Sequence, residues 1–168
     1  MMDKIELTET NKKALLDLMA QEIESASGKK ALEYGSGICS LAAELRGNLE
    51  YLACTDRSGD VLNGFRETPG KSDIYLIPDA ELGEDCYFGR FHLVYTLFGF
   101  QGLSHLVDEI MRLRRLILKG GKMVIIGLAD DQADADCLKQ LKRCGFSDIK
   151  NEKFDLDGLT VFRISAVK

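Results

Sequence analysis

The sequence predicts a doubly wound α/β domain, in which helices cover both faces of one mostly parallel sheet. Two observations lead to this prediction. Short apolar segments of strand type alternate with segments whose apolar residues recur at spacings of three and four, the period of an amphipathic helix. Near the end of the chain, two further strand-like segments are separated only by a turn, which is typical of an antiparallel hairpin.

Length and composition suit one folded domain. We expect it to span residues 1–168, with an N-terminal helical segment, 1–28, packed on the core. Apolar residues make up 45% of the chain and charged residues 29%, as in ordinary globular domains. The formal charge is −5 and the basic residues are scattered, so nucleic acid is not an expected partner.

The expected location is the cytoplasm. No apolar run approaches the roughly 20 residues of a membrane span, and the polar start of the chain lacks the apolar core of a signal peptide. The five cysteines form no C-x-x-C pair, so neither a disulfide framework nor a zinc or other metal site is predicted. We interpret them as small buried hydrophobic residues of a reducing compartment: Cys39, Cys54, Cys86, Cys137 and Cys144.

The first half of the chain shows one helix and then three strand segments. An apolar stripe over 14–26 predicts the first helix, which ends near Ser27 and Gly28. Strands are predicted over 30–34, 50–55 and 73–77, and the connecting helices over 41–45 and 59–67. Because these units follow one another directly, we expect the strands to be parallel.

The second half continues the alternation. A fourth strand is predicted over 91–96 and a strong helix over 104–118, with Gly120 and Gly121 ending it. A fifth strand over 122–127 is apolar nearly throughout, as in a strand buried on both faces. A helix over 133–144 follows, and strands over 147–154 and 159–167 flank a turn at 155–158. The charges of the 104–118 helix suit its macrodipole, with Asp108 and Glu109 near the start and Arg112, Arg114, Arg115 and Lys119 near the end.

A glycine-containing turn follows the first predicted strand. Residues 33–39 read Glu-Tyr-Gly-Ser-Gly-Ile-Cys, and glycines at this place let a ligand approach the backbone. In doubly wound folds, ligands bind at the carboxyl ends of the strands where strand order reverses. Two spaced glycines are also compatible with a tight turn kept only for packing.

Two acids follow the next strands. Asp56 ends the second strand, 19 residues after Gly37, where a carboxylate can accept hydrogen bonds from the two hydroxyls of a ribose. The alternative is a solvated acid at a strand end. Asp79 follows the third strand and could accept a hydrogen bond from an adenine amino group, or simply form a turn.

With these segments in order, the sequence resembles class I S-adenosylmethionine-dependent methyltransferases from about residue 11 to residue 168. Residues 31–37, Ala-Leu-Glu-Tyr-Gly-Ser-Gly, look like the first motif of that family, Asp56 matches its ribose-binding acid, and Asp79-Ala80 is similar to its adenine-contacting pair. Segments 91–96, 116–121 and 145–146 look like its fourth strand, the entry to its fifth and the bend before its sixth. The resemblance implies strand order 3-2-1-4-5-7-6, with strand seven antiparallel. It also implies S-adenosyl-L-methionine as cofactor, held by Glu33, Tyr34, Gly35, Ser36, Gly37, Asp56, Arg57, Asp79, Ala80, Thr96 and Leu97.

Two residues depart from the family pattern. Cys39 stands where the third glycine is usual and narrows the loop. His92 stands where an aspartate is common, and no Asp/Asn-Pro-Pro-Tyr/Phe sequence follows, which disfavours methylation of nucleic-acid bases. Between two apolar residues of a strand, His92 is interpreted as structural.

The candidate substrate residues follow the fourth strand. Phe98, Gly99, Phe100 and Gln101 would offer aromatic walls and one amide to a small organic acceptor, although both phenylalanines would also suit the core. His105 lies near the start of the next helix, where it could transfer a proton or simply lie at the surface.

The sequence therefore predicts a methyltransferase that acts on a small-molecule acceptor by direct methyl transfer, without a dedicated nucleophile. Because no segment for a lid is visible, a second hypothesis is a non-catalytic binding module, or one whose site is completed by a protein partner or a second copy. A third is a nicotinamide-binding Rossmann protein. Ser40 replaces the third glycine of that fingerprint, and a separate substrate domain has no room.

Overall fold

The computed structural model describes residues 5–37, 40–67, 73–130 and 132–168, and places its strands in one sheet. Its seven strands follow the order β3-β2-β1-β4-β5-β7-β6, as the resemblance implied. Strands β1 to β5 pair in parallel, whereas β7 runs antiparallel to both β5 and β6. The strands are β1 Lys30–Tyr34, β2 Tyr51–Thr55, β3 Tyr75–Leu76, β4 Phe91–Leu97, β5 Ile117–Leu128, β6 Ser147–Leu156 and β7 Leu159–Val167.

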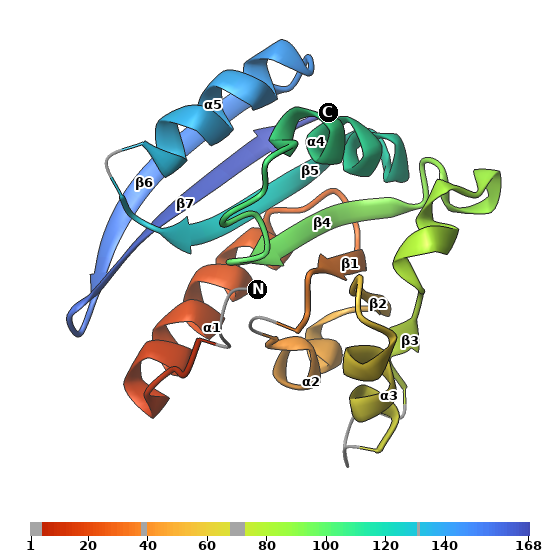
Figure 1. The fold of residues 1–168 in the computed structure, drawn as a ribbon, viewed down its shortest axis with the longest axis horizontal. Coiled ribbons are helices and arrows are strands. Elements are labelled where there is room, and N and C mark those ends of the chain that lie inside the picture. The colour runs from red at the N-terminus through yellow and green to blue at the C-terminus, as the bar shows by residue number, and fades with distance from the viewer. Residues whose placement is uncertain (1–4, 38–39, 68–72, 131) are drawn as a thin grey trace.

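Helices cover both faces of the sheet, as predicted (Figure 1). Helices α1 to α3 lie below the sheet in this view, and α4 and α5 above it. The bounds are α1 Glu9–Glu24, α2 Ala42–Leu45, α3 Gly59–Glu67, α4 Leu106–Leu116 and α5 Ala133–Arg143. Between β3 and β4 the chain forms two 3-10 turns, Asp79–Gly83 and Asp85–Tyr87.

Each face of the sheet contributes to its own apolar cluster. Below it, Leu15 and Met19 of α1 are fully buried against Ala31, Leu93 and Val124 of the sheet. Above it, Ile110 and Leu113 of α4 pack with Leu32, Val94 and Ile125. Successive residues of one strand thus enter opposite clusters, as the alternation of side chains along a strand requires.

The α4–β5 junction differs from the prediction. Helix α4 ends at Leu116, and Gly120 and Gly121 lie inside β5 rather than ending the helix. Ile117 instead pairs with Phe91 of β4, and the register shifts before Leu93 pairs with Lys122. Pairing at the sheet ends the helix early, and the left-handed φ of +79° at Gly120 accommodates the irregularity.

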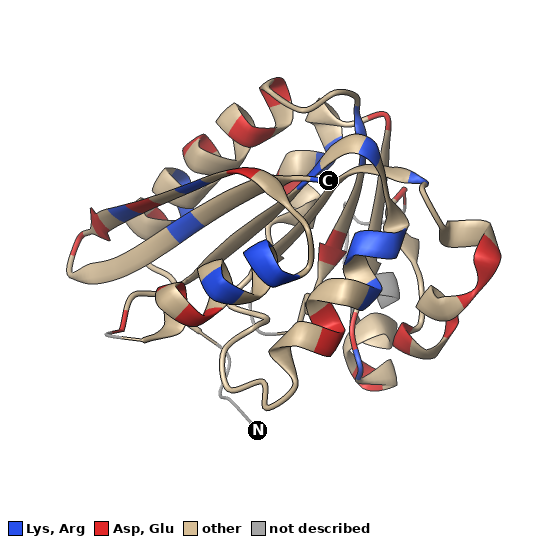
Figure 2. Ribbon diagram, turned by 90° about the horizontal axis from the view of Figure 1, so that it is seen from above, with Lys and Arg blue, Asp and Glu red and all other residues tan. Residues whose placement is uncertain are grey.

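The closing hairpin is tighter than the sequence indicated. Strand β6 continues to Leu156 and pairs there with Leu159, so only Asp157 and Gly158 form the turn. Both have positive φ, 53° and 84°, which is the conformation of the two-residue turns that match strand twist. Acidic and basic residues are interspersed along β6 (Figure 2), and such charges protect an edge strand from pairing with other chains.

In the part of the chain that the structure describes, no helix is both long and apolar enough to cross a bilayer.

Candidate functional site

The glycine turn after β1 packs against the neighbouring strand. The backbone N–H groups of Gly35 and Ser36 both donate to the carbonyl of Thr55 at the end of β2, over 2.9 and 3.3 Å. Gly35 has φ +74°, a conformation that favours glycine. The turn therefore lies at the carboxyl ends of β1 and β2, where the sequence placed it. Ile38 and Cys39 are outside the described residues.

Glu33 is the fully buried anchor of this turn. Its Oε1 accepts hydrogen bonds from the hydroxyls of Ser36 (2.7 Å) and Ser40 (2.5 Å). Its Oε2 accepts from the Tyr95 hydroxyl (2.9 Å) and the Leu41 backbone N–H (3.2 Å). Burial raises the pKa of Glu33, although these hydrogen bonds oppose the shift. The carboxyl thus ties the turn to the start of α2.

Asp56 lies beside the glycine turn at the end of β2, partly exposed. Its two carboxylate oxygens accept from the backbone N–H groups of Gly37 (2.9 Å) and Ser58 (2.8 Å). A Cβ on Gly37 would lie 2.9 Å from both the Asp56 carboxylate and the Val61 side chain, so a larger residue here would displace one of these side chains. Each carboxylate oxygen has a further lone pair, which leaves capacity for ribose hydroxyls.

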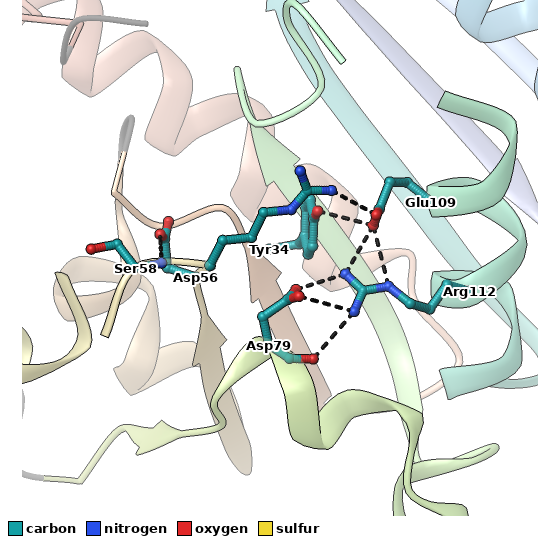
Figure 3. A network of polar contacts seen from close by, with 7 residues as sticks. Tyr34, Asp56, Ser58, Asp79, Glu109 and Arg112 are labelled. Atoms are coloured by element: carbon teal, nitrogen blue, oxygen red, sulfur yellow. Dashed lines mark hydrogen bonds and ion pairs between the residues drawn. The ribbon is translucent and has the colours of Figure 1, made fainter. Parts of the chain in front are cut away.

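A polar network spans the ends of β1, β2 and β3 and reaches α4 (Figure 3). The Tyr34 hydroxyl donates to Glu109 over 3.0 Å, and Arg57 pairs with the other oxygen of Glu109 at 2.6 Å. Arg112 donates to both carboxylate oxygens of Asp79, over 2.6 and 3.2 Å, and to Glu109 over 2.9 Å. The positive charges of the two arginines thus neutralise the negative charges of the two carboxylates.

The network determines the protonation of its members. Burial, and next the charge and hydrogen bond of Glu109, raise the pKa of Tyr34 to about 12, so this phenol remains protonated at neutral pH. Burial disfavours the charge of Arg112, but hydrogen bonds to Asp79 and Glu109 outweigh it and raise its pKa. Tyr34 is therefore a hydrogen-bond donor here and not a base.

Asp79 is close to where the sequence placed it, but it has a partner that the sequence did not reveal. Asp79 and Ala80 begin the first 3-10 turn after β3, and the Asp79 carboxylate faces Arg112 instead of standing free (Figure 3). Glu109 and Arg112 were interpreted from the sequence only as complements of the helix macrodipole. Their spacing of three residues, which places both on one face of α4, is the signal that could have revealed them.

Arg112→Met should test this pairing. We expect the free energy of unfolding to fall by about 1–2 kcal/mol, because Asp79 and Glu109 lose charge-assisted hydrogen bonds in a partly buried place. The measurement is urea denaturation. Arg115→Met is the matched control, since Arg115 lies on the same helix over the Phe88 ring, 4.1 Å from its centroid. Equal losses in the two variants would contradict a special role of the network.

The turn after β4 closes against the glycine turn. Gly99 donates from its backbone to the Thr96 hydroxyl over 3.1 Å. A Cβ on Gly99 would lie 2.3 Å from that oxygen and 3.0 Å from the Tyr34 carbonyl, and one on Gly35 would lie 3.1 Å from Gly99 Cα. Phe98, fully buried beside it, has φ +62°. Such a conformation is unusual for a bulky residue and occurs preferentially at functional sites.

A cavity of about 390 Å³ opens on the other side of this turn, at the carboxyl ends of β4 and β5 and between α4 and α5. Its described lining includes Phe98, Phe100, Gln101, Asp130, Asp136 and Phe162. Of the predicted substrate residues, the structure brings Phe98, Phe100 and Gln101 to this cavity. The phenylalanines are also buried, so the core interpretation and the lining interpretation both apply.

The remaining predicted residues lie as follows. Thr96 and Leu97 are buried at the end of β4. His105 is exposed just before α4 and is not among the described lining residues of the cavity. His92 is at the opposite end of β4 from the turn and covers Gly28, where a Cβ would come within 2.4 Å of the imidazole. Within the described ranges, no three metal-binding side chains cluster, and none of the described cysteines forms a disulfide. Cys54, Cys137 and Cys144 are buried as expected, but Cys86 is exposed on the second 3-10 turn, so the prediction was wrong for that residue.

The residues at the glycine turn suit S-adenosylmethionine in part. Gly35 and Gly37 bring the backbone of the turn against Gly99 and the Asp56 side chain, and Asp56 keeps lone pairs for a ribose. At the adenine end, Arg112 already binds both oxygens of the Asp79 carboxylate, so an amino group would have to share that carboxylate with the arginine. Glu33 has both oxygens engaged inside the protein, so we assign it the positioning of the turn.

No protein-family model matches the sequence, and no curated protein matches it. The fold, in contrast, is similar to many solved structures. An S-adenosylmethionine-dependent methyltransferase from Mesorhizobium loti aligns with a TM-score of 0.73 at 14% identity, over 94% of this chain and 98% of that one. A methyltransferase of the same cofactor from Aquifex aeolicus aligns with a TM-score of 0.70 at 14% identity, over 96% and 98%. The chain therefore has the class I methyltransferase fold.

The same fold also carries other chemistry. The [4+2]-cyclase SpnF aligns with a TM-score of 0.75 at 13% identity, over 92% of this chain and 80% of that one. Function therefore has to be argued from the residues of this chain.

Proposed function

We propose that this protein is an S-adenosylmethionine-dependent methyltransferase that acts on a small molecule in the cytosol. The observation that carries the proposal is the juxtaposition of the glycine turn with Asp56, whose carboxylate lies 2.9 Å from the Gly37 backbone nitrogen. When bound, the cofactor supplies a methyl group already activated by its sulfonium.

In this proposal each part of the site has a separate task. Gly35 and Gly37 let the ligand lie against the backbone, Asp56 accepts from its ribose, and Glu33 holds the turn in place. Beyond the post-β4 turn, the cavity at Phe98 and Phe100 would hold the acceptor away from water. No described residue of the site is arranged as an activated nucleophile, and direct transfer needs none.

The test is a thermal-shift titration with S-adenosylmethionine, S-adenosylhomocysteine and NADH. At about 100 times its dissociation constant, a ligand should stabilise the chain by about 2.7 kcal/mol, or roughly 5–11 °C. We expect this shift with both adenosyl ligands and none with NADH. Asp56→Ala should weaken it, whereas Asp60→Ala, an exposed acid of the neighbouring helix, should leave it unchanged.

One observation favours a second candidate, a module that binds the cofactor only with a partner or a second copy. Arg112 holds the carboxylate that would recognise adenine, and the Arg57–Glu109 pair links the end of β2 to α4. A partner that drew Arg112 away would free Asp79. If millimolar adenosyl ligand causes no thermal shift, the hypothesis of a methyltransferase that binds its cofactor alone is excluded, and this second candidate is left.

A further inference from the structure

The cavity beside the post-β4 turn has walls suited to a particular kind of molecule. Phe98, Phe100 and Phe162 stand in its wall, where Phe100 keeps some exposed surface (8%) and the other two are buried, and the volume of about 390 Å³ is that of a small-ligand pocket. Aromatic faces carry negative charge density and attract cations as well as apolar groups. Among the described lining residues, there is no Lys, Arg or His.

The charges at the mouth of the cavity are negative. Asp130 accepts from the backbone N–H groups of Gln132 (2.9 Å) and Ala133 (2.5 Å), and these bonds lower its pKa, so it is ionised at neutral pH. Asp136 accepts through one oxygen from the Gln132 side chain (3.0 Å), and its exposed carboxylate keeps further acceptor capacity.

Lys153 acts on the charge of Asp130, but it is shared with a third carboxylate, because it pairs with Asp134 at 3.2 Å. The surrounding negative charge also affects the pKa of the buried Cys137 thiol, which lines the cavity. Burial first, and then the carboxylates of Asp136, Asp134 and Asp130, raise its pKa to about 12.

One further group in the wall lacks a partner. The side-chain Oε1 of Gln101 is buried and makes no hydrogen bond in the described structure. A buried acceptor of this kind costs free energy unless a donor reaches it. Because this oxygen has almost no exposed surface, a ligand donor would reach it only if the Gln101 side chain turned towards the cavity.

We propose that this cavity binds a compact organic cation, such as a primary or secondary ammonium with an aromatic or branched aliphatic body. The body would lie against Phe100 and its partly exposed neighbours Leu103 and Leu106, and the positive charge would face Asp136 and Asp130. A corollary rests on the proposed function: these amines would be the methyl acceptors. The bound ammonium would first release one proton to solvent at the cavity mouth, and its nitrogen lone pair would then form the bond to the methyl carbon as the bond from that carbon to sulfur breaks and S-adenosylhomocysteine leaves.

Three probes with the same aromatic ring, similar size and different charge test the binding. They are 2-phenylethylamine, 2-phenylethanol and 3-phenylpropionate, titrated into the full chain at low salt and followed by protein NMR. The amine should bind at least about tenfold more tightly than the alcohol, and the carboxylate should bind most weakly. Added salt should weaken the binding of the amine, so that its affinity approaches that of the alcohol, and it should not weaken the binding of the other two probes.

Variants assign the preference to the cavity. Asp136→Asn should lower the affinity for the amine about threefold to tenfold and leave that for the alcohol unchanged. Asp85→Asn, an exposed acid of the second 3-10 turn, is the matched control and should change neither. Equal affinities for the three probes, no binding at millimolar concentration, or no effect of Asp136→Asn would each overturn the inference.

These titrations contain no adenosyl ligand, so they separate the two proposals. If the protein prefers the amine but binds no adenosyl ligand, the cation site is supported and the corollary about methyl acceptors is excluded. If the protein binds the adenosyl ligands but does not distinguish the probes by charge, the proposed methyltransferase is supported and the cation site is excluded.

Discussion

Replacing Glu33 by alanine should lower the free energy of unfolding by about 3–5 kcal/mol, the largest loss that we expect from a single substitution at this site. Glu33 is fully buried, and its carboxyl accepts from two hydroxyls and the Cys54 thiol at one oxygen and from a hydroxyl and a backbone N–H at the other. Alanine would leave a cavity and these five donors without their acceptor. Urea denaturation at neutral pH measures the loss.

Glu33→Gln separates the loss of the hydrogen bonds from the loss of the negative charge. The amide oxygen can accept from Leu41 and Tyr95, while the amide N–H₂ donates to the hydroxyls of Ser36 and Ser40, which can reverse their own bonds. We therefore expect glutamine to retain most of the stability that alanine loses. Equal losses in the two variants would show that the hydrogen bonds of this carboxyl do not hold the turn.

The stabilities of the wild type and of Glu33→Gln should depend differently on pH. Because burial raises the pKa of Glu33 above its ordinary value of 4.5, the unfolded chain releases this proton at lower pH than the folded chain. The contribution of Glu33 is therefore most favourable below about pH 4.5, and it declines as the pH rises through the folded-state pKa. Denaturation curves from pH 4 upward should show this decline in the wild type and not in Glu33→Gln.

Gly99→Ala should lower the free energy of unfolding by about 1–3 kcal/mol, because the added methyl group is forced against well-packed atoms. Its Cβ would lie 2.3 Å from the Thr96 hydroxyl oxygen and 3.0 Å from the Tyr34 carbonyl. The post-β4 turn would have to move away from β1. Denaturation measures the stability, and the adenosyl titration should show an affinity lowered about tenfold or more.

Gly83→Ala is the control for Gly99→Ala. A Cβ at Gly83 meets nothing within 4 Å, and Gly83 is not among the glycines with positive φ. Its stability should remain within about 0.5 kcal/mol of the wild type. Wild-type stability and affinity in Gly99→Ala would mean that the two turns do not need their close contact.

Much of the candidate site followed from patterns that are local in the chain. The turn at Gly35 and Gly37 and the acid at Asp56 were predicted because both follow strand segments directly, and parallel strands bring their carboxyl ends to one edge of the sheet. Phe98 and Phe100 were predicted for the same reason and line the cavity. Their roles in binding remain predictions for the titrations to decide.

The partners within the site did not follow from such patterns. Tyr34 and Glu109 are 75 residues apart, and Arg112 and Asp79 are 33 apart. The sequence showed that α4 carries acids at its start and bases at its end, which the macrodipole already explains. The opposing charges on the neighbouring strand ends became visible only once the helix was packed on the sheet.

The sequence by itself determined the alternation of strands and helices, the resemblance that implied the strand order, and the positions of the glycine turn and Asp56. These depend on hydrophobic period and turn chemistry, which act over a few residues. Tertiary structure alone decided that Glu33 is sealed inside the turn, that Asp79 is bound to Arg112, and that Asp130 and Asp136 flank an aromatic cavity. The physical reason is that burial and ion pairing depend on which surfaces the packed helices bring together, and local patterns do not specify those surfaces.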